Sequence, residues 1–520
     1  MKSARFVCLF AILLLAALVS VLLAQSAPGS HDTHVLSAEP AAHPLPAEQK
    51  PTVNFARAVA YRSGGYAPDF IFVATGDLNG DGKMDLVVTN ECLFCNRDGF
   101  CDGQSGIVSV LLGNGDGTFQ SASIYGSGGE APDSVTLADV NGDGKLDIIV
   151  ANENSNSVGV LLGNGDGTFR PVVTYSSGGW NATSVAVADV NGDGNLDLIV
   201  ANECQTSDNC NNGNVGVLMG NGEGTFQPAI TYMPGGQYPF SVAVADLNGD
   251  GYPDLAVAGL DGVGLLFGNG DGTFQTGATF SPGGTSIAIG ELNGDGDPDL
   301  VVTGGGGLSV LLGNGYGTFQ SAVTYPSGES DYVVIADING DGKMDLVTAD
   351  LCRQSGTCTT GGVSVLVGNG DGTFQSAIVY GSGGLYATSV AVADVNADNK
   401  PDILVANRCK PCAVGGSVGV LLNDLESVTK TKAATSLDPA KLNQSVTFTA
   451  TITSNPAIPN GEVITFYNAD TQIGASPDAN GVATLTTSFS EPGKYVIKAI
   501  YPGDAFHKAS SGTVKQTVIP

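Results

Sequence analysis

Histidine is nearly absent from this chain of 520 residues, and its few copies lie toward the ends. They are His31, His34, His43 and His507, so none lies between residues 44 and 506. A histidine-based catalytic triad, zinc site or general base is therefore excluded from most of the chain.

Basic residues are scarce as well. Lys and Arg number 21 against 51 Asp and Glu, which gives a formal net charge of -30 although charged residues make up only 14% of the chain. Binding to nucleic acid needs a basic surface that faces the phosphates. The sequence therefore predicts no nucleic-acid partner.

Long hydrophobic runs are missing after the N-terminus. Lys2 and Arg5 precede an apolar run over residues 6–24 and then small residues, a pattern typical of a secretory signal, which we assign to residues 1–26. The run is about 19 residues long, so an uncleaved membrane anchor is the alternative, and after cleavage no span is expected. Residues 27–52 are rich in Ala, Pro and His and predict a disordered linker.

The chain has instead a repeat of about 50 residues. The phrase Asp-x-Asn-Gly-Asp-Gly-x-x-Asp, with substitutions in some copies, begins at residues 77, 139, 189, 246, 291, 337 and 394. A second phrase, close to Val-Leu-Leu-Gly-Asn-Gly-Asp-Gly-Thr-Phe, follows each of the first six copies. Each unit predicts four strands, for example 184–188, 196–200, 215–219 and 226–232, and the first two are apolar on both faces.

Seven four-stranded sheets with buried faces favour a β-propeller, because radial repetition covers both faces of each sheet. Residues 55–61 resemble the fourth strand of a unit (compare 119–125), whereas the seventh unit lacks a fourth strand of its own. We therefore predict an all-β protein with a seven-bladed propeller over 53–424, in which 54–61 pair with 417–422 and close the ring.

The first phrase predicts calcium loops. Side-chain oxygens stand at positions 1, 3, 5 and 9, and Ca²⁺ takes six to eight oxygen ligands, while glycines at positions 4 and 6 permit the left-handed turns that bring the ligands together. Solvated Asx-turns without metal are the alternative. We expect about seven structural Ca²⁺ ions, held by Asp77, Asn79, Asp81, Asp85, Asp139, Asn141, Asp143, Asp147, Asp189, Asn191, Asp193, Asp197, Asp246, Asn248, Asp250, Asp254, Glu291, Asn293, Asp295, Asp299, Asp337, Asn339, Asp341, Asp345, Asp394, Asn396, Asp398 and Asp402.

Two loops depart from the pattern. Glu291 replaces the first Asp of loop five and should still ligate. Loop seven has Ala397 and Asn399 in place of both glycines, and alanine tolerates the left-handed region poorly, so this site is predicted to be the weakest.

With these motifs the sequence resembles the FG-GAP/VCBS repeat family, whose propeller is similar to that of integrin α subunits. The resemblance covers about residues 53–424. It implies calcium in the loops between the first and second strands, and commonly a binding role outside the cell.

Cysteines gather in the loops between the second and third strands. In an exported chain they favour local disulfides that clip these loops. The sequence of Cys409 to Cys412 also resembles a redox motif, and Cys95 has no assigned partner. The predicted disulfides are Cys92–Cys101, Cys204–Cys210, Cys352–Cys358 and Cys409–Cys412.

Loops sort by face because antiparallel strands alternate in direction. The calcium loops and the Gly-Asn-Gly turns are expected on one face, and the cysteine loops and blade-to-blade links on the other. These links carry Tyr66, Trp180, Tyr238 and Tyr386. Aromatic side chains beside variable loops suit recognition of a sugar or a protein, and packing over the blade seams is the alternative.

The composition changes near residue 427. Alternating segments at 445–451, 461–466, 482–487 and 494–501 predict a β-sandwich over 428–520. Gly461 to Phe466 and Ala499 to Asp504 resemble bacterial Ig-like modules of group 3. The resemblance implies a spacer or adhesive unit of a surface protein.

We interpret the chain as a monomeric, calcium-binding bacterial protein that is secreted or held at the cell surface. It is expected to bind a carbohydrate or protein without catalysis. The alternative is an extracellular polysaccharide-degrading enzyme, a lyase or hydrolase on the propeller scaffold, and a third possibility is a purely structural envelope component. Fold alone does not choose among them.

Overall fold

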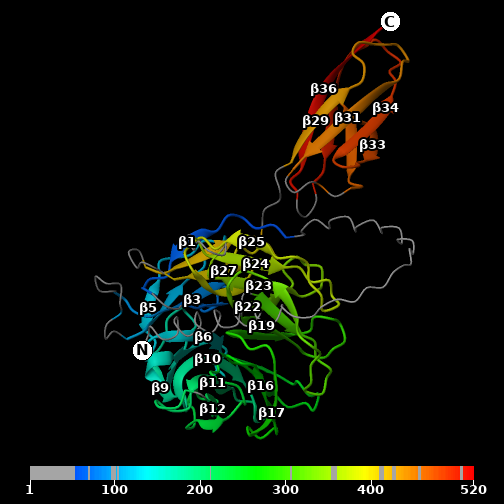
Figure 1. Cartoon of the computed structure of the whole chain (residues 1–520). Helices are drawn as coiled ribbons and strands as arrows, with labels where there is room; N and C mark the ends of the chain where they lie inside the picture. Colours follow the sequence, from blue (N-terminus) through cyan, green and yellow to red (C-terminus); the bar gives the residue numbers. More distant parts are fainter. Residues whose placement is uncertain are drawn as a thin grey trace, which may run out of the picture.

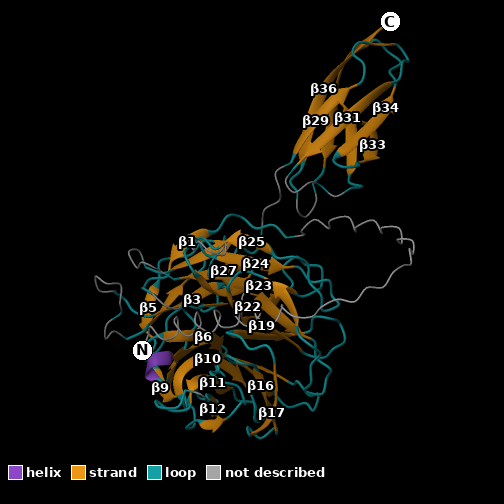
Figure 2. Ribbon diagram, in the orientation of Figure 1, coloured by secondary structure: helices purple, strands orange, loops and turns teal. Residues whose placement is uncertain are grey.

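The computed structural model describes residues 53–520 except 68–70, 95–100, 102–104, 211, 305–306, 353–359, 409–414, 424–428, 455–457, 459 and 504–506. The predicted signal and linker therefore lie outside the described residues, as do Cys95, Cys358 and the pair Cys409–Cys412. Strands dominate the described part of the chain, where the helical element is one short 3₁₀ turn, η1 (Glu153–Ser155) (Figure 2).

Seven antiparallel sheets of four strands form the larger body. Blade 1 consists of β2 (Val73–Gly76), β3 (Asp85–Asn90), β4 (Ile107–Leu111) and β5 (Ser123–Gly126). Blade 2 consists of β6 (Pro132–Ala138), β7 (Asp147–Asn152), β8 (Ser157–Leu161) and β9 (Val173–Ser176). Blade 3 consists of β10 (Trp180–Ala188), β11 (Asp197–Cys204), β12 (Asn214–Leu218) and β13 (Ile230–Tyr232). Blades 4 and 5 consist of β14 (Ser241–Ala245), β15 (Asp254–Ala258), β16 (Val263–Gly268) and β17 (Phe274–Phe280); and β18 (Ser286–Gly290), β19 (Asp299–Gly304), β20 (Gly307–Leu311) and β21 (Val323–Pro326). Blades 6 and 7 consist of β22 (Ser330–Ala336), β23 (Asp345–Asp350), β24 (Gly362–Leu366) and β25 (Ile378–Gly381); and β26 (Ala387–Ala393), β27 (Asp402–Asn407), β28 (Ser417–Leu421) and β1 (Val59–Arg62).

The blades follow one another around a ring. The first strand of each blade contacts the first strand of the next, and β26 of blade 7 contacts β2 of blade 1. Figure 1 shows the same order as a run of colours from cyan through green to yellow, with the blue strand β1 beside the yellow strands. The predicted all-β, seven-bladed propeller is confirmed.

Burial within a blade follows the sequence pattern. The second and third strands, such as β7 and β8, are buried at every residue, because their side chains are apolar or hydrogen-bonded on both faces. Fourth strands such as β9 are largely exposed, and first strands such as β6 keep partly exposed residues toward the axis of the ring. The core therefore consists of apolar layers between neighbouring blades.

The N-terminal strand closes the ring as predicted. β1 pairs antiparallel with β28, from Val59 opposite Val420 to Arg62 opposite Ser417. Each blade also places a fourth-strand Tyr or Phe edge-to-face against a Phe of the following blade. Blades 2 and 3 give Tyr175–Phe226 at 5.4 Å between ring centroids, and the closing segment gives Phe55–Tyr380 at 5.3 Å. Residues 55–62 thus supply blade 7 with the missing part of its repeat.

The C-terminal module has a three-stranded and a five-stranded sheet. Phe448, Phe466 and Tyr501 are fully buried in its core. The four strands predicted here are present, whereas β29, β30, β33 and β36 were not predicted. The sheets consist of β29 (Lys430–Thr435), β31 (Val446–Thr453) and β34 (Val482–Thr487), and of β30 (Ala440–Lys441), β36 (Ser510–Ile519), β35 (Gly493–Tyr501), β32 (Val463–Asn468) and β33 (Thr471–Pro477).

Candidate metal loops and the variable face

The first acidic loop shows how the repeated phrase folds. Gly80 and Gly82 have φ angles of 74° and 78°, a left-handed conformation that turns their N–H groups inward. Both N–H groups donate to the Asp77 carboxylate at 2.8 Å. Asn79 Oδ1 accepts the N–H of Asp81 at 2.9 Å, and Asp81 Oδ1 accepts that of Lys83 at 3.0 Å. The side-chain oxygens at positions 1, 3 and 5 therefore line one tight loop, and the same bonds recur in loops three, four and six.

The aspartate at position 9 has a second, structural role that the sequence did not reveal. Asp85 is fully buried, and its two oxygens accept the N–H of Leu78 at 2.9 Å and of Gly113 at 2.7 Å. It therefore ties the acidic loop to the turn after the third strand of its own blade. All seven loops have this pair of bonds, made by Asp85, Asp147, Asp197, Asp254, Asp299, Asp345 and Asp402.

These buried aspartates are under electrostatic strain. Burial raises their pKa, two backbone N–H bonds oppose the rise, and two other carboxylates of the same loop add to it. The pKa reaches about 6 for Asp147, Asp254, Asp299, Asp345 and Asp402 and is also raised for Asp85 and Asp197. Three carboxylates thus lie close enough to repel one another in every loop.

The donor set of the loops consists of carboxylate, amide and carbonyl oxygens, which are the hard ligands that Ca²⁺ prefers. Within the described residues no three His, Cys, Asp or Glu side chains are already grouped around a common metal position. The position-1 and position-9 carboxylates are instead turned toward backbone N–H groups. Carboxylates keep further lone pairs beside such bonds, so the buried aspartates at the blade turns are consistent with calcium sites.

The two irregular loops keep the same backbone. Glu291 accepts the N–H of Gly294 at 2.6 Å and that of Gly296, as Asp77 does in loop one. In loop seven Ala397 and Asn399 adopt φ angles of 61° and 63°. Alanine is therefore held in a left-handed conformation that costs about 1–2 kcal/mol for an L-residue.

Six of the seven acidic loops, all but loop two, are also bonded to a neighbouring blade. The N–H of Gly167 in blade 2 donates to the Leu78 carbonyl of loop one at 3.1 Å, and the N–H of Gly117 in blade 1 donates to the Val395 carbonyl of loop seven at 3.0 Å. We call the acidic loops and these turns (residues 77–85 and 113–119 and their equivalents) the loop face. The prediction that both lie on one face is confirmed, and the bonds across blade seams are an addition to it.

The opposite side, formed by the links between blades and the loops after the second strands, is the variable face. Trp180 pairs with Cys204 at the start of β10 and is 44% exposed, while Tyr66 pairs with Cys92. Tyr238 and Tyr386 are half-buried. The four predicted aromatic residues thus lie on this face, each in a different blade, rather than together.

Disulfides clip the loops of the variable face. Cys92–Cys101 and Cys204–Cys210 are formed, which confirms two predicted pairs. Cys352 is also disulfide-bonded, and its predicted partner lies outside the described residues.

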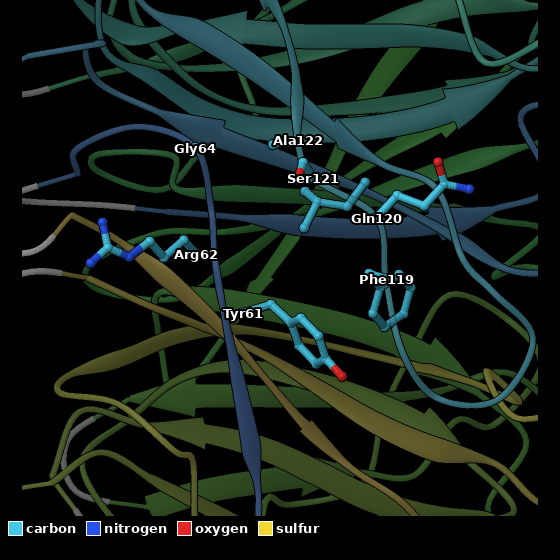
Figure 3. Close-up of a pocket in the computed structure, with 8 residues that line it drawn as sticks. Tyr61, Arg62, Gly64, Phe119, Gln120, Ser121 and Ala122 are labelled. Carbon is cyan, nitrogen blue, oxygen red and sulfur yellow. The ribbon is translucent and has the colours of Figure 1, made fainter.

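Two cavities flank the closing segment. One of about 340 Å³ is lined by Tyr61, Arg62 and residues 119–122 of blade 1, and Figure 3 shows the Tyr61 ring directed toward Phe119. The other, of about 770 Å³, lies between residues 55–58 and Tyr380 to Leu385. Both lie at the seams on either side of blade 7, beside the closing segment.

The described residues contain no helix with the length and apolar character needed to cross a membrane.

Comparison with family models matches most of the propeller and the C-terminal module. A model described as the FG-GAP-like repeat matches residues 77–150, 139–200, 206–257, 246–302, 291–348 and 351–405. A model of the bacterial Ig-like domain (group 3) matches residues 431–519. No curated protein matches the chain.

Several solved structures are similar to this chain. A lectin from Agrocybe aegerita, described by its recognition of non-reducing terminal N-acetylglucosamine, is 24% identical over 63% of this chain and 90% of its own, with a TM-score of 0.42. The biofilm matrix protein Bap1 of V. cholerae is 13% identical over 90% and 92%, with a TM-score of 0.34. The extracellular domain of the putative one component system BT4673 from B. thetaiotaomicron is 9% identical over 89% and 59%, with a TM-score of 0.37. None of these likenesses assigns a ligand to this chain.

Proposed function

Because this chain belongs to the FG-GAP-like repeat family, we propose that it is a calcium-stabilised, non-catalytic binding protein that acts outside the cell. The observation that carries the proposal is the contrast between its two faces. The loop face repeats one set of bonds in every blade, whereas the variable face differs from blade to blade in cysteines and aromatic residues. Binding residues are usually found on variable loops held by a rigid scaffold.

Calcium would act on the loop face as a structural ion. Each ion would be held by the side chains at positions 1, 3, 5 and 9, for example Asp189, Asn191, Asp193 and Asp197 in loop three. A divalent cation would neutralise the mutual repulsion of the three carboxylates in a loop. Because the loop is bonded both to its own blade and to a neighbour, such an ion would stiffen the seam as well as the loop.

An extracellular location is supported by the disulfides. Disulfides form and persist in oxidising compartments and are rare in the cytosol. Those described here close loops of the variable face, where they would hold a binding surface in shape. The Ig-like domain would serve as a spacer or docking unit.

The ligand proposed for the variable face is a carbohydrate or protein that contacts Tyr66, Trp180, Tyr238 or Tyr386. Aromatic rings contribute large contact areas at low entropic cost and stack on sugar rings. The absence of histidine from residues 44–506 supports a role without catalysis, since it removes the commonest general base.

A glycan array combined with a reducing-sugar release assay tests this function. The purified full chain in calcium is expected to bind glycans or a surface protein without releasing reducing ends. Release of reducing ends would instead establish the polysaccharide-degrading enzyme. Neither binding nor turnover would favour a purely structural envelope component.

A further inference from the structure

The inner strands of the blades follow a common rule near the variable face. Five blades have a serine five residues before the acidic loop. Each serine Oγ accepts the N–H of a residue in the next blade, at 3.4–3.5 Å. These serines are Ser134, Ser184, Ser241, Ser286 and Ser389.

A second bond of this kind comes from the residue just before the serine. Thr183 Oγ1 donates to the Pro239 carbonyl at 3.0 Å, Thr285 Oγ1 to the Asp331 carbonyl at 3.1 Å, and Thr388 Oγ1 to the Ile71 carbonyl at 2.6 Å. In each case the carbonyl belongs to the next blade. The Thr-Ser pair therefore connects the first strand of its blade to the first-strand segment of the next blade by side-chain hydrogen bonds.

Blades 1 and 6 break this rule at both positions, blade 1 with Ile71 before Phe72. Blades 2 and 4 keep the serine but have Asp133 and Phe240 in place of the threonine. Asp331 and Tyr332 stand where blades 3, 5 and 7 have Thr-Ser, and Phe72 stands at the serine position of blade 1. The rings of Phe72 and Tyr332 meet edge-to-face with centroids 5.9 Å apart, although blade 7 lies between their blades. Within the described residues neither the Asp331 nor the Tyr332 side chain takes part in a hydrogen bond.

Two further departures lie beside this pair. Asp350 ends β23 where four other blades have asparagine, and its carboxylate accepts the hydroxyls of Ser330, Thr348 and Ser364 at 2.6–2.9 Å. Arg408 of blade 7 stands where blades 1 to 3 have glutamate. Its guanidinium lies 4.8 Å from the centroid of the Tyr386 ring.

The charges of these groups act on Asp331. Burial raises the pKa of Asp331 to about 7, Arg408 opposes the rise, and Glu329 and Asp350 add to it. Asp331 nevertheless keeps partial exposure, as do Phe72, Tyr332 and Tyr386. The Asp331 carboxylate is costly to desolvate, has no hydrogen-bond donor and stands where blades 3, 5 and 7 have a threonine bonded to the next blade. Such a group is expected of a functional site rather than of the scaffold.

We propose that Asp331 and Arg408, with the rings of Phe72, Tyr332 and Tyr386, form a sugar-binding subsite at the variable-face end of the propeller axis. Strand β22 begins on this face and leads to the acidic loop at Asp337, which places Asp331 near the variable end. This inference rests on the proposed function and narrows it to one site.

The expected ligand is a neutral pyranose. The Asp331 carboxylate accepts hydrogen bonds from its hydroxyl groups, and the aromatic rings offer a surface for its C–H face. A uronic acid is disfavoured because Glu329, Asp331 and Asp350 give the site an excess of negative charge over the single Arg408.

The test measures binding of the full chain in calcium to an array of neutral, uronic-acid and amine-bearing oligosaccharides, followed by titration with the neutral glycan bound best. The key variant is Asp331→Thr, which installs the residue of blades 3, 5 and 7. Asp331→Asn is the isosteric second variant. Asp133→Thr, the same change at the equivalent position of blade 2, is the matched control.

We expect Asp331→Thr and Asp331→Asn to weaken binding of the neutral glycan by roughly tenfold or more, because a hydrogen bond to a charged acceptor is lost. Asp133→Thr should leave the affinity within about twofold of the parent. The melting temperature of Asp331→Thr should equal or exceed that of the parent, since threonine can restore the bond to the next blade.

Glycan binding that persists in folded Asp331→Thr and Asp331→Asn would overturn the subsite and leave the proposed function standing. Binding limited to uronic-acid or amine-bearing glycans would overturn the neutral ligand. A parent chain that binds no glycan would overturn both the carbohydrate function and the subsite.

Discussion

The loop face and the variable face of the propeller are built from the same strands, yet they follow opposite rules. On the loop face, seven copies of one carboxylate position make the same two backbone bonds, and substitutions such as Glu291 and Ala397 preserve the geometry. On the variable face, the Thr-Ser pair recurs in some blades and is replaced by Asp331 and Tyr332 in another. We therefore infer that the repeated residues stabilise the propeller, and that residues departing from the repeat are the better candidates for a functional site.

Removal of calcium should have the largest effect, because it acts on every blade of the loop face at once. A ligand that binds only the folded state stabilises it by about 2.7 kcal/mol per site at a hundredfold excess over Kd. We therefore expect excess EGTA to lower the melting temperature of the full chain by roughly 10 °C or more. Calorimetric titration of the stripped protein should count close to seven sites.

Restoration by added Ca²⁺ but not by Mg²⁺ is the control for this experiment, since Mg²⁺ demands a smaller and more rigid site. A melting curve that does not change in EGTA would show that the loops are metal-free Asx-turns.

The two roles of the position-9 aspartate can be separated in loop three. Asp197→Ala removes a proposed calcium ligand and also leaves the N–H groups of Val190 and Gly220 without their acceptor. We expect it to lower the free energy of unfolding by about 3 kcal/mol in calcium, since buried unsatisfied N–H groups cost ~1–3 kcal/mol each. The loss should be smaller in EGTA, where the strained carboxylate no longer faces a cation. Urea denaturation in both buffers measures it.

Asp193→Ala is the matched control, because Asp193 stands at position 5 and its Oδ1 accepts only the loop's own Asn195 N–H. Its stability should fall in calcium and stay nearly unchanged in EGTA. Equal losses for Asp193→Ala in the two buffers would contradict a calcium site in this loop.

On the variable face, Trp180→Ala should affect binding more than stability. Trp180 is 44% exposed, so its removal leaves little buried space unfilled. If it anchors the ligand, the glycan or protein found by array screening should bind about 1–3 kcal/mol more weakly. Tyr316→Ala is the control on the loop face, where Tyr316 is 81% exposed. Large destabilisation with intact binding would mean that Trp180 packs over a seam.

Much of the fold could be predicted because the sequence pattern of each blade recurs in seven units. The period, the buried strands and the resemblance of residues 55–61 to a fourth strand together specify the ring and its closure. The loops could be predicted too, since glycine at two fixed positions and oxygen at four others describe one backbone.

The position-9 bonds and the bonds across seams could not be predicted, because they join residues such as Asp197 and Gly220 whose proximity depends on the packing of strands. Asp331 was missed for a related reason. In the sequence, an aspartate at this position is not distinctive, because blade 2 has Asp133 there. Asp331 stands out only when the inner strands are aligned on the bonds that their Thr and Ser side chains make to the next blade.

Substitutions in loop seven should have the smallest effect on stability, and they test whether its two non-glycine residues strain the backbone that the other loops share. Ala397 has a φ of 61°, where an alanine side chain is strained and glycine is not. Ala397→Gly should therefore raise the free energy of unfolding by about 1 kcal/mol, part of the strain relief being offset by the greater freedom of glycine in the unfolded chain. Asn399→Gly should change it less, because asparagine tolerates the left-handed region. Thermal melts in calcium and in EGTA measure both variants. A gain in both buffers would locate the effect in the backbone, whereas a gain confined to calcium would mean that the alanine weakens ion binding at this site. Ala397→Gly that is no more stable than the parent in either buffer would show that the loop adopts another backbone in solution.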